Sequence, residues 1–308
     1  MTMLSHVIAK AAPTLQPKHI VCDDDRDLGL FETQAILAHL LDVDRAWLIT
    51  HPEYKLTKTQ YKKFQHLLKR RQKHEPFAYL FGKKDFFGKE FLVNKHVLIP
   101  RPDTETLIEN ALKIQSQSHV QAPIIWDIGT GSGAIAITLA SHIPQSTILA
   151  TDTSKRALVM AKKNAKKHGV QTRITFLQQN LLQSKAFRWL KSHKAKKALI
   201  ICANLPYLPT SDKKILESDI TKYEPKTALY SGKDGLDLIK KLLRQIARHA
   251  TEWGYKQVSI LLEYDPPQTK TLLAEIHHLF PQAKTAIQQD LAGRDRVCHI
   301  QLSYEDLT

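Results

Sequence analysis

The chain has 308 residues, 43% of them hydrophobic, and a formal net charge of +15 at pH 7. This length is comfortable for two domains with a sizeable core. No stretch is apolar enough for a membrane span, and residues 1–12 lack the apolar core of a signal peptide. The three cysteines, Cys22, Cys202 and Cys298, are too few and too scattered for a disulfide framework or a metal site. We therefore expect a soluble protein of the reducing cytoplasm with no membrane partner.

The positive charge is unevenly distributed along the chain. Residues 1–50 carry four basic and seven acidic residues, whereas residues 51–96 carry twelve basic and four acidic ones. Between Thr153 and Ala198 there are thirteen Lys or Arg and no Asp or Glu. Such a field would attract nucleic acid, the ribosome or an acidic protein. Solvated helix faces explain it equally well, because no Arg-rich or aromatic-interleaved patch is present, so contact with the ribosome or with nucleic acid stays an open alternative.

The first 75 residues are predicted to be mainly helical. Apolar residues recur at helical spacing from Leu28 to Leu41, residues 42–44 break this run, and a second helix is expected over 57–73. Pro76 should end the helical character. The segment 77–100 is rich in Phe, Tyr and Val and has two glycines at turn positions, which predicts short strands or a hairpin.

A different pattern follows Pro102. A helix should begin there, capped by Asp103 or Thr104, and run to about Gln115. From Pro123 onward, apolar strands alternate with helical segments, which predicts an α/β domain with a mostly parallel sheet covered on both faces. The predicted strands are Ile124–Ile128, Thr147–Thr151, Ile174–Leu177, Ala198–Ala203, Val258–Glu263, Thr285–Gln289 and Val297–Leu302.

A glycine loop follows the first of these strands. It reads Asp127-Ile-Gly-Thr-Gly-Ser-Gly133 and leads into the apolar helix 134–140. Glycines let the backbone pass close to a ligand, and the helix N-terminus offers free N–H groups. The loop also satisfies the dinucleotide fingerprint G-x-G-x-x-(G/A). S-adenosylmethionine is favoured over NAD by Asp127, by the third alternating glycine and by the downstream motif Asn204–Tyr207.

Two further strand ends carry candidate cofactor ligands. Asp152 ends the second strand, where its carboxylate could accept hydrogen bonds from both ribose hydroxyls or else cap the next helix. Asn180 follows the third strand, where folds of this kind often place an acid that accepts from the adenine amino group. The side-chain oxygen of an asparagine can accept in the same way.

The segment Asn204-Leu-Pro-Tyr207 follows the fourth strand and resembles an (Asn/Asp)-Pro-Pro-Tyr clamp for a planar nitrogen. The Asn204 side-chain oxygen can accept one N–H of the acceptor, and the Leu205 carbonyl can accept the other. Pro206 stiffens the turn, and Tyr207 offers a ring face. Holding a poorly nucleophilic amide in this way supplies orientation and electrostatic help as positive charge develops on its nitrogen. An ordinary strand-to-loop turn is the competing interpretation.

Together these residues resemble the release-factor glutamine methyltransferases, the PrmC/HemK family. The resemblance covers nearly the whole chain from about Phe31. The segment Ile99–Glu105 is its most specific part, since nucleic-acid methyltransferases with the same core lack it. The matching segments are Glu75–Gly82, Phe87–Val93, Val97–Glu105, Asp127–Gly133, Asn204–Tyr207, Tyr223–Leu229, Gly232–Leu236 and Asp290–Val297.

The resemblance implies a helical substrate-recognition domain at residues 1–76, a β-hairpin linker at 77–102, and a Rossmann-like class I methyltransferase domain with a seven-stranded sheet at 103–308. It implies methyl transfer from S-adenosyl-L-methionine to the glutamine side-chain amide in the Gly-Gly-Gln motif of class 1 peptide chain release factors, which act in translation termination. The implied catalytic residues are Asn204, Leu205, Pro206 and Tyr207. The implied cofactor residues are Asp127, Gly129, Thr130, Gly131, Ser132, Gly133, Asp152, Asn180, Leu181 and Asn204, with the 180–181 pair flanking the adenine.

Leu205 departs from the family's Asn-Pro-Pro-Tyr pattern, and Asn-Leu-Pro-Tyr is more familiar from ribosomal RNA adenine dimethyltransferases. Because the role at this position belongs to a backbone carbonyl, we expect lost rigidity and unaltered chemistry. Three alternatives stay open: a ribosomal-protein glutamine methyltransferase, an adenine-amino methyltransferase of RNA or DNA, and a non-catalytic binding protein. The segment 101–105 favours the release-factor branch, and the intact loop and clamp argue against a protein without catalysis.

Overall fold

The structure, a computed structural model, describes residues 2–15, 24–118, 120–193, 198–214 and 222–303. They form two compact units. The first comprises the described residues up to Gly82 together with residues 222–223, and the second comprises the remaining described residues from Lys83 onward. None of the described helices is long and apolar enough to cross a membrane. Cys202 and Cys298 are free and buried, and Cys22 lies outside the described residues.

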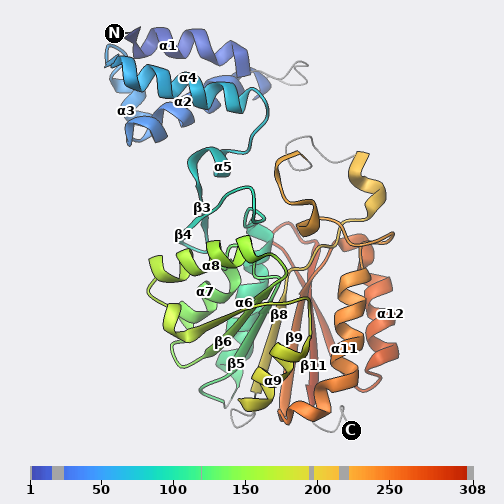
Figure 1. Ribbon diagram of the computed structural model, residues 1–308. Coiled ribbons are helices and arrows are strands. Elements are labelled where there is room, and N and C mark those ends of the chain that lie inside the picture. Colours follow the sequence, from blue (N-terminus) through green and yellow to red (C-terminus); the bar gives the residue numbers. More distant parts are fainter. Residues whose placement is uncertain (1, 16–23, 119, 194–197, 215–221, 304–308) are drawn as a thin grey trace. The chain divides into compact units, whose positions relative to one another are not determined.

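The first unit is helical, as predicted (Figure 1). Its helices are α1 (Leu4–Ala11), α2 (Asp24–Leu41), α3 (Arg45–Thr50), α4 (Lys58–Arg71) and α5 (Phe77–Phe81), with the 3-10 turn η1 (Ala12–Leu15) after α1. Two short strands, β1 (Thr2–Met3) and β2 (Lys55–Leu56), pair antiparallel. Apolar side chains from α1 to α4 pack into a core of their own, which includes Leu4, Ile36, Leu37 and Phe64.

Local capping explains where these helices begin. Thr57 and Gln60 form a reciprocal capping box at the start of α4, and the Asp44 side chain accepts from Trp47 N at the start of α3. Asp42 has a φ of 56°, which ends α2 where the sequence predicted a break.

The prediction that helical character ends at Pro76 is wrong. Residues 77–81 form α5, with the N–H groups of Tyr79 and Leu80 bonded to the Pro76 carbonyl. Proline is well tolerated at the start of a helix because its missing N–H would be unpaired there. The rings of Phe77 and Phe81, four residues apart, lie 5.3 Å from one another. The aromatic residues that suggested strands therefore lie next to one another along a helix, with their rings tilted by 42°.

The predicted hairpin is confirmed over a shorter span. It consists of β3 (Lys83–Phe86) and β4 (Lys89–Leu92), paired antiparallel with Phe86 opposite Lys89. The two turn residues, Phe87 and Gly88, have φ values of 48° and 67°, as a two-residue hairpin turn requires.

The second unit contains a seven-stranded sheet in the order β10-β11-β9-β8-β5-β6-β7. Strands β5 to β9 pair parallel, whereas β10 and β11 are antiparallel. All seven predicted strands are confirmed: two have the predicted ends, and the ends of the others differ by at most two residues. They are β5 (Ile124–Ile128), β6 (Thr147–Asp152), β7 (Ile174–Gln178), β8 (Ala198–Ala203), β9 (Gln257–Glu263), β10 (Lys284–Gln289) and β11 (Asp295–Ser303).

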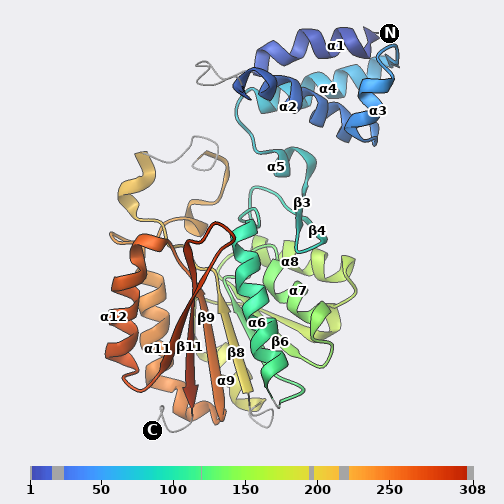
Figure 2. The ribbon, with the colours of Figure 1, turned by 180° about the vertical axis from the view of Figure 1, so that it is seen from behind.

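Helices cover both faces of this sheet (Figures 1 and 2). One apolar cluster joins the sheet to α6 (Glu105–Gln117), α7 (Ala134–His142) and α8 (Lys155–Lys167). The other joins it to α9 (Ser184–Ser192), α11 (Asp237–Trp253) and α12 (Thr269–Leu279). Alternate residues of β5 enter opposite clusters, since Ile124 and Trp126 lie in one and Ile125 in the other. The sheet is therefore buried on both faces, as the continuous apolar strands predicted.

Candidate active site

The candidate residues gather where parallel strands end. From β5 the strand order runs outward through β6 and β7, then returns to the other side of β5 at β8. Ligands of open α/β sheets bind at such a reversal, beyond the carboxyl ends of the strands. The glycine loop follows β5, Asp152 ends β6, Asn180 follows β7 and Asn204 follows β8.

The glycine loop is held by its backbone. The N–H groups of Gly129 and Thr130 both donate to the Thr151 carbonyl, at 2.8 and 2.9 Å. Gly129, Gly131 and Gly133 have φ values of 75°, 54° and 84°, in the left-handed region that favours glycine. A Cβ on Gly133 would lie 2.8 Å from Ile137 Cδ1, whereas at Gly131 the nearest atom would be 3.8 Å away. Gly133 thus permits close packing, and Gly131 leaves space above the loop.

Asp127 lies beneath this loop and is fully buried. Its Oδ2 accepts from the Thr130 hydroxyl at 2.6 Å and from Ala136 N at 3.1 Å. Its Oδ1 has no hydrogen-bond partner in the described parts of the chain. Burial raises the pKa of this carboxyl to about 7. Asp127 therefore ties the loop to the start of α7 and keeps one acceptor free.

The Asp152 carboxylate links two backbone segments. Its Oδ2 accepts from Gly131 N at 2.9 Å, and its Oδ1 accepts from Ser154 N at 2.7 Å. Ser154, not Asp152, caps α8, since its hydroxyl oxygen accepts from Ala157 N. Burial raises the pKa of Asp152 above its usual range. Each carboxylate oxygen can accept one more hydrogen bond.

Asn180 and Leu181 occupy a turn after β7. Asn180 is exposed, whereas Leu181 is buried and has a φ of 46°. The turn is braced by Gln179, whose Nε2 donates to the Leu181 carbonyl and whose Oε1 accepts from Ala186 N. The unusual backbone of Leu181 places its side chain in the wall of the adjacent cavity.

That cavity has a volume of about 290 Å³. The predicted residues in its wall are Gly129, Gly131, Asp152, Asn180, Leu181, Asn204, Leu205 and Pro206. Asp127, Thr130, Ser132, Gly133 and Tyr207 were also predicted as site residues but lie outside this wall, as far as the described residues define it. Several residues that line the wall were not predicted: Lys95, His96, Arg156, Thr227 and Ala228. Lys95, His96, Thr227 and Ala228 lie in or beside segments that match the family, whereas Arg156 lies near none of them.

In the clamp, Asn204 is anchored through its amide nitrogen. Nδ2 donates to Thr104 Oγ1 at 2.9 Å. The side-chain oxygen has no hydrogen-bond partner among the described residues. Leu205 follows with a side chain that is only 4% exposed and belongs to the sheet core. A Cβ on Gly129 would lie 3.2 Å from Leu205 Cδ2, so this leucine packs against the glycine loop.

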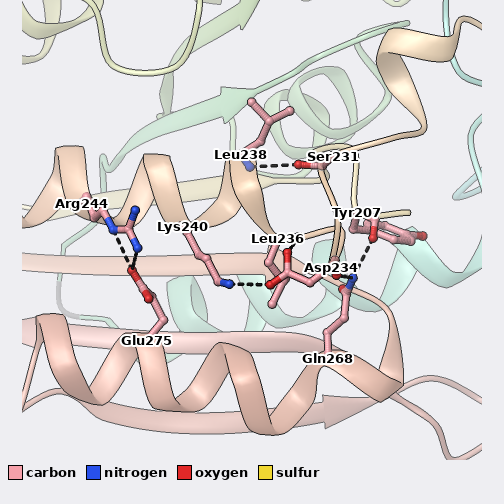
Figure 3. A network of polar contacts seen from close by, with 9 residues as sticks. All are labelled: Tyr207, Ser231, Asp234, Leu236, Leu238, Lys240, Arg244, Gln268 and Glu275. Atoms are coloured by element: carbon pink, nitrogen blue, oxygen red, sulfur yellow. Dashed lines mark hydrogen bonds and ion pairs between the residues drawn. The ribbon is translucent and has the colours of Figure 1, made fainter. Parts of the chain in front are cut away.

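Tyr207 is fixed at both its ring and its backbone. Its hydroxyl donates to Glu263 Oε1 at 3.1 Å, and burial raises the pKa of the phenol above its usual range. Its carbonyl accepts from Gln268 Nε2 at 2.7 Å. Figure 3 shows that Gln268 also reaches the carbonyl of Asp234, whose carboxylate pairs with Lys240. Tyr207 is therefore held in place by Glu263 and Gln268, and it is not among the described residues that line the cavity.

Gly235 makes this arrangement sterically allowed. Its φ is 80°, and a Cβ there would lie 2.0 Å from the Tyr207 carbonyl oxygen and 2.3 Å from Gln268 Nε2. Only glycine fits at this point. The neighbouring Ser231 hydroxyl accepts from Leu238 N at the start of α11 (Figure 3).

The segment 101–104 joins distant parts of the second unit. Arg101 forms an ion pair with Glu224, whose Oε2 also accepts from Ile99 N. Asp103 pairs with Arg296 at 3.2 Å, and Arg296 also pairs with Asp290. Thr104 occupies the N-cap position of α6, as predicted, but it makes no side-chain capping hydrogen bond. A 3-10 turn, η2 (Pro102–Thr104), precedes α6, and the side chains of Asp103 and Thr104 bind other segments instead.

Comparison with known proteins places the chain in a family. A family model described as "PrmC N-terminal domain" matches residues 25–82, and one described as "Methyltransferase domain" matches residues 125–220. The release factor glutamine methyltransferase of Xylella fastidiosa is 36% identical, over 86% of this chain and 90% of that protein. The chain belongs to the release factor glutamine methyltransferase family. The predicted family and the class I methyltransferase fold are thereby confirmed.

Other relatives agree with this assignment. The release factor glutamine methyltransferase of Shewanella oneidensis is 33% identical, over 92% of this chain and 93% of that protein. A bifunctional methyltransferase of Rickettsia bellii is 32% identical over 88% of this chain, which spans about half (51%) of that longer protein. Among solved structures, an hMettl16 catalytic domain in complex with a 3'UTR hairpin has a TM-score of 0.53 at 15% identity, covering 80% of this chain and 82% of that one. That likeness concerns the fold alone.

Proposed function

We propose that this protein transfers a methyl group from S-adenosyl-L-methionine to the side-chain amide nitrogen of the glutamine in the Gly-Gly-Gln motif of class 1 peptide chain release factors. Membership of the methyltransferase family supplies the type of reaction. The observation that carries a planar NH2 acceptor is the clamp, in which Nδ2 of Asn204 is held by Thr104 while its side-chain oxygen has no partner among the described residues. The names of the relatives support a glutamine amide as that acceptor.

The residues at the strand ends fit the cofactor. Asp127 Oδ1 is a buried acceptor with no partner in the described chain, which suits the ammonium group of the methionine moiety. Each Asp152 oxygen has one remaining lone pair for a ribose hydroxyl. The turn at 180–181 offers an apolar side chain and an amide beside the adenine position. The 290 Å³ cavity lies at the lower limit of small-molecule sites.

The clamp can hold a planar amide in the geometry that transfer needs. Oδ1 of Asn204 accepts one N–H of the acceptor, and the Leu205 carbonyl accepts the other. The nitrogen lone pair then points along the line toward the methyl carbon, and orientation of this kind lowers a barrier substantially. The two oxygens also stabilise positive charge as it develops on the nitrogen.

The step balances without a strong base. Bound S-adenosylmethionine supplies an electrophilic methyl group on a sulfonium sulfur. The nitrogen–carbon bond forms as the carbon–sulfur bond breaks, and the electron pair of that bond stays on sulfur as a neutral thioether. Asn204 and Leu205 hold the two N–H groups while the new bond forms, and one of these two protons, which methylation makes acidic, then leaves to water.

We also propose that the first unit recognises the release factor. Support comes from the match of residues 25–82 to the PrmC N-terminal domain and from the names of the relatives. The cytoplasmic location and contact with the ribosome stay predictions.

The test is a transfer assay with tritiated S-adenosylmethionine, offered in parallel to purified class 1 release factor, to ribosomal protein and to bare ribosomal RNA. We expect label in release factor, mapped by mass spectrometry to the Gly-Gly-Gln glutamine, and none in RNA. Methylated adenine with unmodified release factor would overturn the proposal in favour of a nucleic-acid enzyme. Label in a ribosomal protein alone would keep the chemistry and replace the substrate. The Asn204→Ala variant, which lacks the side-chain acceptor of the clamp, serves as the negative control.

A further inference from the structure

Two of the segments that line the cavity lie outside the sheet. Residues 95–98 follow the hairpin and form no helix or strand, and residues 225–228 include the 3-10 turn η6 (Lys226–Ala228). Both contribute to the cavity wall: Lys95, His96, Val97 and Leu98 from the first, and Pro225, Thr227 and Ala228 from the second. Because no strand pairing holds these segments, other contacts have to determine where they lie.

One end of each segment is anchored to another part of the site. Before the first segment, Leu92 exchanges two hydrogen bonds, of 2.8 and 2.9 Å, with the buried side chain of Asn164 on α8. The Asn164 amide nitrogen also donates to the carbonyl of Ser132, in the glycine loop, at 2.8 Å. After the second segment, Leu208 N donates to the Leu229 carbonyl at 3.0 Å. The first segment is thus tied to the glycine loop, and the second to the chain that follows the clamp.

Glu224 connects the other ends of the two segments. Its Oε2 accepts from Ile99 N at 3.1 Å, directly after the first segment, and its Oε1 forms an ion pair with Arg101. Glu224 itself directly precedes the second segment. Its side chain is 1% exposed, and that of Arg101 is 33% exposed. Prolines on both sides of Arg101 restrict the backbone there, which favours the presentation of both donors to one carboxylate.

The burial of Glu224 makes this contact selective for one arrangement of the wall. A charged group inside a protein is costly unless it is paired and hydrogen-bonded. The carboxylate is attached to one cavity-lining segment, and its two donors are attached to the other. If the segments separated, the carboxylate would lose both donors at once. The contact therefore favours the arrangement in which the two segments lie together.

We propose that Glu224 is a positioning residue for the cofactor, and that its contacts with Ile99 and Arg101 hold the two cavity-lining segments together before the cofactor binds. A site with its walls in place loses less conformational freedom on binding. If the segments were together for only part of the time, the apparent affinity would fall by that fraction. The inference rests on the cofactor of the proposed function, S-adenosylmethionine, and is independent of the methyl acceptor.

The first test is Glu224→Gln, which keeps the shape and an acceptor for Ile99 N but removes the charge that pairs with Arg101. We expect the Kd for S-adenosylmethionine, measured by calorimetry, to rise by about tenfold, the difference between hydrogen bonds to charged and to neutral groups. In the transfer assay the KM for the cofactor should change far more than kcat. Unfolding in urea without cofactor checks that the variant is folded. An unchanged Kd in the folded variant would overturn the inference.

Asp103→Asn is the matched control. It removes a charge from the other ion pair of the segment 101–104, between Asp103 and Arg296. Neither residue of this pair is among the described residues that line the cavity or that contact either cavity-lining segment. The Kd for S-adenosylmethionine should stay within about twofold of the wild-type value. A rise equal to that of Glu224→Gln would show a general effect of losing an ion pair and would overturn the inference.

A double variant shows whether Glu224 and Arg101 act as a pair. Arg101→Met alone should weaken cofactor binding, because it leaves a buried carboxylate without its cation. Added to Glu224→Gln, it should raise the Kd by clearly less, since residues that act on one another give non-additive effects. Additive changes would mean that the two act separately, and the inference would be dropped. Because Arg101 is partly exposed, Arg101→Met also tests the pair if Glu224→Gln does not fold.

A further measurement needs no cofactor. In nuclear magnetic resonance spectra of the free protein, the Ile99 N–H should exchange slowly with deuterium in the wild type and in Glu224→Gln. It should exchange faster in Glu224→Ala, which has no acceptor at this point. Equal exchange in all three would refute the contact on which the inference depends.

These experiments separate the inference from the proposed function. If the wild type binds S-adenosylmethionine and the Kd changes as expected, but no release factor is methylated, the proposed acceptor fails and the positioning role of Glu224 stands. If release factor is methylated while Glu224→Gln has the wild-type Kd, the positioning role fails and the proposed function stands.

Discussion

The cofactor half and the acceptor half of the site are built in different ways. The cofactor half is one short segment, 127–133, held by backbone bonds to Thr151 and by the carboxylates of Asp127 and Asp152. The acceptor half, residues 204–207, is held by side chains of Thr104, Glu263 and Gln268. These partners lie 100, 56 and 61 residues away along the chain. The first half is thus local and mostly backbone, and the second is assembled from remote side chains.

This difference separates the expected effects of substitutions. Changes in the cofactor half should alter cofactor affinity, because the loop and Asp152 line the cavity. Changes in the acceptor half should alter turnover at saturating cofactor, because the clamp and its supports hold the group that reacts. Variants at Asn204, Gly235, Gly131 and Asp152 test this division between cofactor affinity and turnover.

Asn204→Ala should have the largest effect. It removes an acceptor that acts on the reacting nitrogen, and we expect kcat to fall by about 10² to 10³-fold, as for a single oxyanion-hole donor. Cofactor affinity, measured by calorimetry, and the unfolding midpoint should change little. Turnover near the wild-type value would remove Asn204 from the mechanism, and a parallel loss of cofactor binding would break the division between the two halves.

Gly235→Ala tests whether the clamp depends on the close approach of Gly235 to Tyr207, and it is compared with a substitution in the glycine loop. Its Cβ would lie 2.0 Å from the Tyr207 carbonyl oxygen, so backbone must shift, and overpacking of this kind destabilises by about 1–3 kcal/mol. The left-handed φ adds about 1–2 kcal/mol. The matched control is Gly131→Ala, which has the same strain in φ but no atom closer than 3.8 Å.

Urea unfolding and turnover should separate these two glycine variants. Gly235→Ala should lose more unfolding free energy and should lose turnover at saturating cofactor. Gly131→Ala should mainly lose cofactor affinity, because its new methyl group enters the space above the loop. Equal unfolding free energies for the two would contradict the close approach at Gly235.

Asp152→Ala should act on the cofactor. We expect its affinity for S-adenosylmethionine to fall by about 1.5–3 kcal/mol, the range for hydrogen bonds to a charged group. Turnover at saturation should be mostly retained. Asp152→Asn, which keeps one acceptor oxygen for Gly131 N or Ser154 N, should give an intermediate loss in calorimetry. Unchanged affinity in both would leave Asp152 with a role in holding the loop alone.

The raised pKa of Asp127 predicts how the free energy of unfolding depends on pH. Burial raises its pKa to about 7, so the native state keeps a proton that the unfolded chain has released above about pH 4. Stability from this group is therefore fully present at low pH and is lost as the pH rises through 7. Asp127→Asn does not titrate, so its unfolding free energy should fall less steeply than that of the wild type between pH 5 and 8.

The remaining slope in Asp127→Asn has its own cause. Glu263 is also fully buried, with a pKa that burial raises to about 7. Its contribution to the free energy of unfolding is therefore also lost as the pH rises. Parallel curves for wild type and Asp127→Asn in urea titrations would show that Asp127 is ionised in the native state throughout this range.

The same contrast explains what could be predicted from the sequence. The loop after β5 and the seven strands were predictable because hydrophobic runs and glycines report local structure. Helix α5 was missed because aromatic residues suit a strand as well as a short buried helix. The roles of Thr104, Glu263 and Gln268 were missed because each acts through one or two hydrogen bonds to distant segments, and no spacing rule describes such pairs.

Leu205 marks the point where a sequence expectation needs revision. We expected only its carbonyl to matter, yet its side chain is buried in the sheet core and contacts the glycine loop. Leu205 donates no backbone hydrogen bond among the described residues, so proline removes no such bond. Proline does remove buried carbons, and large-to-small changes in a core destabilise.

Leu205→Pro is therefore expected to have the smallest effect of the series. The loss of packing, about 1–2 kcal/mol, is partly offset by about 0.4–1 kcal/mol from a stiffer unfolded chain. The control, Leu205→Ala, loses more packing and gains no such offset, so it should unfold at lower urea. Turnover on release factor should stay within about threefold in Leu205→Pro, because the acceptor carbonyl is kept. A folded Leu205→Pro enzyme that binds cofactor but no longer methylates glutamine would show that the leucine side chain itself reads the acceptor, and would strengthen the adenine alternative.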